Sequence, residues 1–129
     1  MIGLILAAGC GTRLVGSDVV RPKCLAPFDG IPLITFQMQA LRACGVDDIV
    51  VVVGFEADRV RRSCPPGVQF VENARFAETN SLYSLWLTRG LLTDGFVGLN
   101  CDVLFHPQLL TDLLGALHED AVLVAARAA

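Results

Sequence analysis

The chain has 129 residues, of which 53% are hydrophobic, and its formal net charge is −3. This length fits one domain with a substantial core, and no run of apolar residues is long enough to cross a bilayer. The ten Lys and Arg residues are scattered instead of forming the basic stripe that nucleic-acid binding needs, and the five cysteines include no CxxC pair. We therefore expect a cytoplasmic protein with reduced thiols that neither inserts into a membrane nor binds nucleic acid.

The chain begins with a run typical of a buried strand, Ile2 to Leu6, which we expect to end in a glycine-rich loop that reaches Pro22. The apolar spacing over residues 32–43 then predicts a helix that Gly45 stops. Residues 49–53 are apolar at every position, which is typical of a strand in a parallel sheet covered on both faces.

The remainder of the chain continues this alternation of strands and helices. A helix that begins at Thr79 or Asn80 is expected to bury one apolar side, formed by Leu82, Leu85, Trp86 and Leu91. The other expected elements are a helix over 56–62, strands over 69–72 and 96–99, a helix over 107–117 and a strand over 121–125. This order predicts one α/β domain over residues 1–129, with a Rossmann-like α/β/α arrangement of three layers and a mostly parallel sheet.

The run LAAGCGTRL, from Leu6 to Leu14, places small residues directly after the first strand. Small residues leave room for a base and a ribose, while Gly11, Thr12 and Arg13 can present N–H groups and a guanidinium to the terminal phosphates of an NTP. The run is not a P-loop, which needs Gly-Lys-Ser/Thr, and Leu14 replaces the third glycine of the dinucleotide-binding pattern GxGxxG. An ordinary tight turn after a strand is the alternative.

Two charged residues are expected beside this loop. Lys23 is the only lysine of the chain and is suited to act as a point charge on one phosphoryl oxygen, which we expect to belong to the α-phosphate. Asp102 follows the strand over 96–99, at the edge where open α/β sheets bind ligands, and is a candidate Mg²⁺ ligand. The alternative for Asp102 is a helix N-cap or a turn residue.

These motifs, with PKCL at residues 22–25, resemble the nucleotidyltransferase superfamily that includes sugar-phosphate nucleotidylyltransferases. The stretch ENARFAETNSLYSL, over residues 72–85, resembles a segment of phosphocholine cytidylyltransferases and their phosphonate-activating relatives. The nucleotide-binding residues that the resemblance implies are Leu6, Ala7, Ala8, Gly9, Gly11, Thr12, Arg13, Lys23, Thr79, Asn80 and Ser81. It also implies catalytic roles for Arg13, Lys23 and Asp102, with Asp102 as the metal ligand, while a plain N-cap is the alternative for Asn80 and Ser81.

The resemblance implies a Mg²⁺-dependent enzyme that transfers CMP from CTP to a phosphorylated small molecule and releases pyrophosphate. The acceptor would be phosphocholine, a phosphonate or a sugar phosphate. The alternatives are an inactive NTP-binding fragment of such an enzyme and a sugar-1-phosphate nucleotidylyltransferase that uses UTP or dTTP. Members of this family continue well beyond a chain of this length and usually add a second metal-binding aspartate, so we expect the N-terminal part of a longer catalytic domain, truncated at its C-terminal end. An exposed sheet edge would make a homodimer possible.

Overall fold

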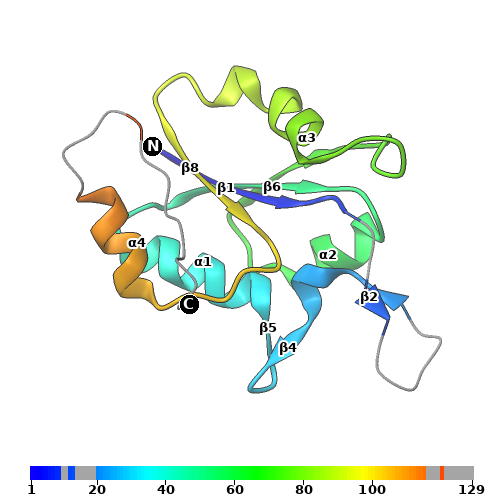
Figure 1. Ribbon diagram of the computed structural model, residues 1–129, viewed down its shortest axis with the longest axis horizontal. Helices are drawn as coiled ribbons and strands as arrows, with labels where there is room; N and C mark the ends of the chain where they lie inside the picture. Colours follow the sequence, from blue (N-terminus) through cyan, green and yellow to red (C-terminus); the bar gives the residue numbers. More distant parts are fainter. Residues whose placement is uncertain (10–11, 14–19, 116–119, 121–129) are drawn as a thin grey trace, which may run out of the picture.

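A computed structural model describes residues 1–9, 12–13, 20–115 and 120, and its centre is a sheet of parallel strands (Figure 1). The strands of this sheet are β1 (Ile2–Ala7), β6 (Asp48–Val53), β7 (Val68–Glu72) and β8 (Phe96–Asn100), in the order β7-β6-β1-β8. Every neighbouring pair is parallel, and β1 lies between β6 and β8. The predicted parallel sheet is therefore confirmed, with the carboxyl ends of its strands at one edge.

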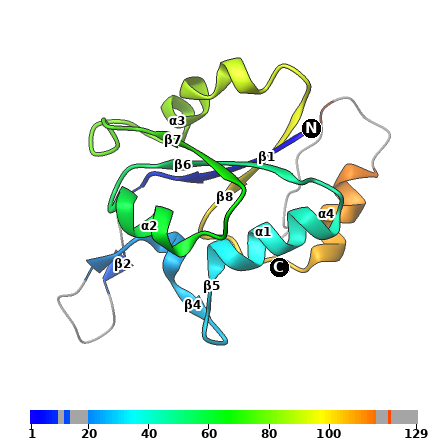
Figure 2. The same ribbon diagram turned by 180° about the vertical axis from the view of Figure 1, so that it is seen from behind.

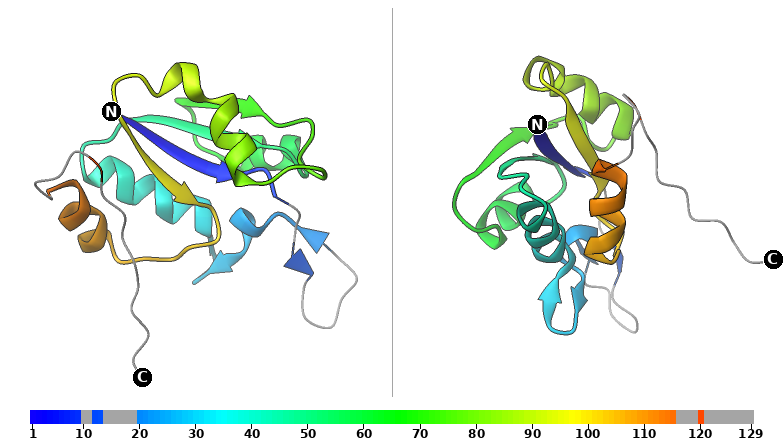
Figure 3. Two further views of the ribbon diagram at one scale, coloured as in Figure 1. Left: turned by 45° about the horizontal axis from the view of Figure 1, so that its top comes forward. Right: turned by 90° about the vertical axis from the view of Figure 1, so that its left-hand side faces the viewer.

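Helices cover both faces of the sheet, as Figures 1 and 2 show from opposite sides. One face carries α1 (Leu33–Ala43), α2 (Ala57–Ser63) and α4 (Pro107–Leu114), and we call it the three-helix face. The other face carries α3 (Ser81–Leu87), followed by a 3-10 helix, η2 (Arg89–Leu91), and we call it the α3 face. The two further views separate the same layers, which confirms the predicted α/β/α arrangement (Figure 3).

Alternating side chains of the strands build two separate hydrophobic clusters. Ile5 of β1 and Val51 of β6 pack with α1, α2 and α4 on the three-helix face. Leu4 of β1 and Val52 of β6 face the opposite way, toward Leu85 of α3. Because successive residues of a strand point to opposite faces, a strand covered on both sides is apolar throughout, as the sequence of β6 predicts.

Short elements that the sequence analysis did not predict lie between β1 and α1. They are the hairpin of β2 (Thr12–Arg13) and β3 (Val20–Arg21), the 3-10 helix η1 (Lys23–Leu25), and the hairpin of β4 (Pro27–Phe28) and β5 (Ile31–Pro32). Strands of two residues are too short to produce an alternating pattern in a sequence. The predicted loop up to Pro22 therefore contains a paired segment.

The predicted apolar side of α3 is wrong at two positions. Leu82 is 72% exposed and Trp86 is 51% exposed, whereas Leu85 packs against the sheet. Asn80 caps the helix, and the buried residues Ser84 and Thr88 continue the inward side, so the helix is rotated relative to the expected phase. Polar side chains thus occupy part of the side that hydrophobicity alone assigned to leucine and tryptophan.

The C-terminal predictions are only partly within the described residues. The predicted helix over 107–117 is confirmed as α4, which ends at Leu114, while residues 116 and 117 and the predicted strand over 121–125 lie outside the described part. In the part that the structure describes, no helix has the length and apolar character needed to span a bilayer.

Candidate active site

A pocket of about 370 Å³ lies at the carboxyl edge of the sheet. The ends of β1 and β8, the 3-10 helix η1, the loop after β7 and the start of α3 all contribute to its wall. The lining residues are Leu6, Ala8, Gly9, Lys23, Asn73, Phe76, Thr79, Asn80, Ser81, Ser84, Asn100, Cys101 and Asp102. Open α/β sheets bind their ligands at this edge, so the pocket is the candidate active site.

The end of β1 presents small residues to the pocket. Leu6, Ala8 and Gly9 line it, and a Cβ placed on Gly9 would meet no atom within 4 Å. Ala7 points the other way and is buried in the cluster on the three-helix face, so its side chain does not line the pocket. The structure therefore brings three of the four predicted residues of this strand end to the candidate site.

Lys23 and Asp102 are the charged residues among those that line the pocket. They lie 79 positions apart in the sequence, on η1 and on the turn that follows β8, and both side chains are exposed. A cation and a carboxylate that line one pocket are suited to contact a phosphate and its metal ion. The structure thus places together the two charges that the sequence analysis assigned to one site.

Two buried thiols are the chain neighbours of these charged residues. Cys24 follows Lys23 and Cys101 precedes Asp102, and both are free cysteines. The hydrogen bond that Cys24 donates to Cys101, together with burial, raises the pKa of the Cys24 thiol well above its usual range. Cys24 is therefore a protonated, small apolar side chain that packs in the cluster on the three-helix face.

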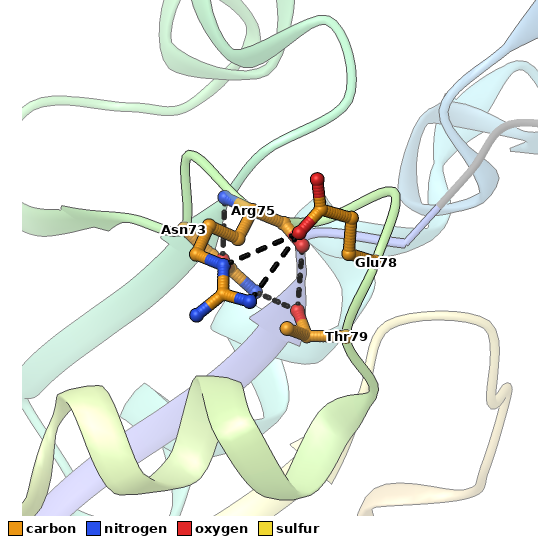
Figure 4. Close-up of polar contacts among 4 residues, drawn as sticks. All are labelled: Asn73, Arg75, Glu78 and Thr79. Atoms are coloured by element: carbon orange, nitrogen blue, oxygen red, sulfur yellow. Dashed lines mark hydrogen bonds and ion pairs between the residues drawn. The ribbon is translucent and has the colours of Figure 1, made fainter.

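The loop between β7 and α3 is organised by one buried amide, that of Asn73, which is 1% exposed. Its nitrogen donates to Thr79 Oγ1 at 3.0 Å and to Ser84 Oγ at 3.1 Å, and its oxygen accepts from the backbone N–H of Arg75 at 3.0 Å. Thr79 in turn donates to the Arg75 carbonyl at 2.8 Å (Figure 4). The Thr79 hydroxyl proton is thus already used within the loop, so the contribution of this side chain is to hold the loop's shape.

Gly54 allows the same loop to approach β1. A Cβ at Gly54 would lie 2.7 Å from Cβ of Phe76 and 2.8 Å from the carbonyl oxygen of Ala8, distances that real Cβ atoms essentially never show. Phe76 also packs edge-on against Phe55, with ring centroids 6.1 Å apart. The result is an aromatic wall of the pocket whose position depends on the missing side chain of Gly54.

The start of α3 also lines the pocket. Asn80 Oδ1 accepts hydrogen bonds from the N–H groups of Leu82 and Tyr83, at 3.1 and 3.3 Å, which confirms Asn80 as the N-cap. Asn80 also lines the pocket together with Ser81, so capping and ligand contact are compatible for the same residue. The amide nitrogen of Asn80 and the Ser81 hydroxyl are groups that can contact a base.

The remaining predicted residues lie at the hairpin beyond β1 or outside the described part. Thr12 and Arg13 belong to β2, where they pair with Arg21 and Val20 of β3. Gly11 lies outside the described residues. Their proposed contacts with the terminal phosphates stay predictions.

Several pocket residues were missed by the sequence analysis. They are Asn73, Phe76, Ser84, Asn100 and Cys101. Asn73, Phe76 and Ser84 stand inside the stretch over 72–85 whose resemblance was noted, and Asn100 directly precedes Cys101 and Asp102. Most of these residues thus stand in or beside motifs that the sequence analysis noted, but the local sequence does not show which side chains point into the pocket.

The donor set suits a metal ion that the protein shares with a substrate. Asp102 supplies one exposed carboxylate at the pocket, and the described residues contain no group of three or more His, Cys, Asp or Glu side chains able to hold a metal ion. Mg²⁺ is commonly bound through one or two carboxylates plus substrate phosphates. A single exposed carboxylate such as Asp102 therefore fits a Mg²⁺ ion that substrate phosphates also hold.

Comparison with known proteins gives a family match over nearly the whole chain. The profile described as a MobA-like NTP transferase domain matches residues 3–129. The choline-phosphate cytidylyltransferase of Streptococcus pneumoniae is 34% identical over 116 residues, which is 88% of this chain and 50% of that protein. The CMP-5'-(3-aminopropyl)phosphonate synthase of Streptomyces rubellomurinus is 34% identical over 124 residues, which is 92% of this chain and 20% of that protein.

Solved structures give the same grouping. A CTP:phosphocholine cytidylyltransferase structure from Streptococcus pneumoniae matches with a TM-score of 0.65 and 33% identity, over 78% of this chain and 45% of that one. An inositol-1-phosphate CTP transferase from T. maritima matches with a TM-score of 0.69 and 28% identity, over 92% of this chain and 49% of that one. The chain thus spans about half the length of the relatives of known structure, and half or less of the other two.

Proposed function

Because this chain belongs to the MobA-like NTP transferase domain family, we propose that it acts in the transfer of CMP from CTP to a phosphorylated small molecule, with release of pyrophosphate. The observation that carries the proposal is the meeting of Lys23, Asp102 and the small residues at the end of β1 in one pocket. The names of two relatives that are each 34% identical, a choline-phosphate cytidylyltransferase and a CMP-phosphonate synthase, support CTP as the nucleotide.

The proposed reaction follows from the charges at the pocket. An oxygen of the acceptor's phosphate or phosphonate forms a new bond to the α-phosphorus, and the bond between that phosphorus and the bridging oxygen of the leaving pyrophosphate breaks. The acceptor is already an anion, so no general base is needed and catalysis depends on alignment and charge neutralisation. We propose that Lys23 contacts the α-phosphate and that Asp102 holds the nucleotide's Mg²⁺, which would neutralise phosphate charge.

We propose that the base lies against the wall formed by Phe76 and the start of α3. Asn80 and Ser81 line this wall with polar groups that can contact the edge of a pyrimidine, and Thr79 keeps the loop in place. Gly11, Thr12 and Arg13 would contact the terminal phosphates. The acceptor, as phosphocholine, a phosphonate or a sugar phosphate, would be selected by parts of the protein that this pocket does not include.

Two alternatives make different predictions. An NTP-binding fragment would bind CTP without releasing pyrophosphate, since an incomplete acceptor site cannot align the attack. A sugar-1-phosphate nucleotidylyltransferase would prefer UTP or dTTP. Some support for the latter comes from the bifunctional sugar-1-phosphate nucleotidylyltransferase/acetyltransferase of Sulfurisphaera tokodaii, which is 47% identical over 53 residues, or 41% of this chain and 13% of that protein.

The test uses the 129-residue chain with two readouts. Calorimetry with CTP, UTP and dTTP, each with and without Mg²⁺, measures binding. Pyrophosphate release with phosphocholine, 2-aminoethylphosphonate and glucose 1-phosphate measures transfer. CTP binding with CTP-dependent release supports the proposal, and binding without release with any acceptor supports the fragment alternative.

Variants separate the proposed site from general damage to the fold. Lys23→Ala and Asp102→Ala should each lower transfer by about 10²- to 10³-fold, because a charge that stabilises the reacting phosphates is lost. Matched controls are Arg62→Ala, at an exposed cation on α2, and Asp47→Ala, at an exposed carboxylate beside the amino end of β6. Equal losses of transfer in the controls, or undiminished transfer in both site variants, would contradict the proposed roles.

A further inference from the structure

Gln37 makes a contact that joins α1 to the turn carrying Asp102. It is 2% exposed, on the side of α1 that packs under the sheet. Its Nε2 donates to the backbone carbonyl of Asn100 at 2.8 Å and to that of Val103 at 2.8 Å. One side-chain nitrogen therefore holds the residues on either side of Cys101 and Asp102.

This turn has little other support from the sheet. The strand β8 ends at Asn100, and the last backbone bond to β1 beyond it runs from the N–H of Cys101 to the carbonyl of Leu6, at 3.3 Å. The N–H of Val103 then donates to the carbonyl of Asn100 at 3.3 Å, which closes the turn on itself. The helix α4 begins only at Pro107. Between the last sheet bond and this helix, Cys101 and Phe105 pack against the cluster on the three-helix face, while Gln37 holds the carbonyls of Asn100 and Val103.

The direction of the Asp102 side chain depends on this turn. Among the described residues, no hydrogen bond or ion pair is found for the Asp102 carboxylate, and the side chain is exposed at the pocket. Within the described part of the chain, the position of this carboxylate is therefore set by the backbone that carries it. Metal ligands whose supporting groups are removed typically lose affinity even when the ligand itself remains.

We propose that Gln37 is a positioning residue for Asp102: by fixing the turn from Asn100 to Val103, it holds the carboxylate where the metal ion of a bound nucleotide needs it. This inference rests on the proposed function, because it takes Asp102 as the ligand of a nucleotide-bound Mg²⁺. It assigns a role in the site to a side chain that lies on the opposite face of the sheet from α3 and does not line the pocket.

The first test compares CTP affinity by calorimetry in Mg²⁺ and in EDTA. Gln37→Met keeps the length of the side chain but cannot donate to either carbonyl. We expect this variant to bind CTP about tenfold more weakly than wild type in Mg²⁺, and to match wild type in EDTA. Gln39→Met, at an exposed position two residues further along the same helix, is the matched control and should leave both affinities unchanged.

A double-mutant cycle identifies Asp102 as the group through which Gln37 acts. Asp102→Asn alone should remove most of the Mg²⁺ contribution to CTP affinity. In that background, Gln37→Met should have little further effect, since the position of the side chain no longer matters for metal binding. Additive losses would overturn the inference.

Hydrogen exchange gives a readout that does not need a nucleotide. The amides of Cys101, Asp102 and Val103 should exchange faster in Gln37→Met than in wild type, whereas those of β6 should not change. If Gln37→Met does not fold, Gln37→Asn is used instead, since it keeps an amide but is one methylene too short to reach both carbonyls. Unchanged exchange in a folded variant would overturn the inference.

The outcomes for the site and for Gln37 can be told apart. A wild-type chain that binds no CTP, or binds it equally in Mg²⁺ and EDTA, overturns the proposed metal site itself. A wild-type chain with Mg²⁺-dependent binding, together with a Gln37→Met chain that keeps it, overturns only the role of Gln37. Equal weakening of CTP binding in Mg²⁺ and in EDTA means that Gln37 serves the fold alone and likewise overturns it.

Discussion

The two faces of the central sheet are packed in different ways. On the three-helix face, the buried cluster draws on β1, β6 and β8 and on α1, α2 and α4, and it is almost wholly apolar. On the α3 face, the buried cluster consists of Leu4, Ala8, Val50 and Val52, and the covering helix turns Ser84 and Thr88 inward while Leu82 faces solvent. We therefore expect the first face to contribute more to stability, whereas next to the pocket the second face has a network of polar contacts in place of apolar packing.

The difference shows how a small domain can combine a rigid scaffold with a polar site. Asn73 joins the loop after β7 to α3 by hydrogen bonds, which fix direction more strictly than apolar contacts do. The three-helix face reaches the site as well, through η1, which carries Lys23, and through Gln37. Lys23 and Asp102 are thus supported from the three-helix face, whereas the loop after β7 is held by polar contacts on the α3 face.

The largest effect on stability is expected from truncation on the three-helix face. Leu41→Ala removes a fully buried side chain of α1 and should lower the free energy of unfolding by about 2 to 5 kcal/mol, because it leaves a cavity that the close-packed cluster cannot fill. Denaturant unfolding followed by circular dichroism measures the loss. A loss of less than about 1 kcal/mol would contradict the view that this face carries the stability.

Asn73→Ala tests the polar network on the α3 face. The expected loss of unfolding free energy is about 1 to 3 kcal/mol, since three hydrogen bonds are removed and a buried gap is left. CTP affinity should fall as well, because Thr79 and Ser84, which line the pocket, are no longer held. The control is Gln69→Ala, which removes an exposed side chain from the edge strand β7. A stability loss without a change in CTP affinity would separate the network from the site.

The pH dependence of Cys64 tests how well the three-helix face excludes water. Burial raises the pKa of the Cys64 thiol to about 11, from 9.0 for an ordinary cysteine. The folded chain therefore keeps this proton longer than the unfolded chain, so the associated stability is fully present below pH 9 and is lost as the pH rises toward 11. The alkylation rate of Cys64, followed by mass spectrometry, should have its midpoint near pH 11 in the folded chain. A midpoint near 9 would show that water reaches this thiol.

The smallest effect is expected at the exposed side of α3. Leu82→Ala should change the free energy of unfolding by less than about 0.5 kcal/mol, because the leucine side chain is already in solvent. Leu85→Ala on the same helix is the comparison and should cost more, since Leu85 packs against the sheet. Urea titrations of both variants measure the two changes in unfolding free energy. Similar losses in both variants would mean that Leu82 is buried beside Leu85, as the sequence analysis predicted.

Much of the fold follows from local patterns. The run of valines over residues 50–53 is apolar at every position, which only a strand covered on both faces requires, and the structure has that strand as β6. The bounds of α1 and β1 differ from the predicted ones by a single residue at one end. The phase of α3 could not be predicted in this way, because it depends on the hydrogen bond that Asn73 donates to Ser84 and on those that Asn80 accepts, and not on hydrophobic spacing alone.

The sequence by itself determined which charged residues were candidates for the site. Lys23 and Asp102 each stand out locally, one as a lone lysine after a proline and the other as an aspartate after a strand, because the carboxyl ends of parallel strands meet at one edge. Only the tertiary structure decided how they are held. Gln37 lies more than 60 positions from the carbonyls it contacts, and Asn73 forms its hydrogen bonds from a loop. The spacing of apolar residues in the sequence therefore predicts neither contact. Periodicity records which face of an element is buried, whereas a hydrogen bond between distant segments depends on the packing that brings them together.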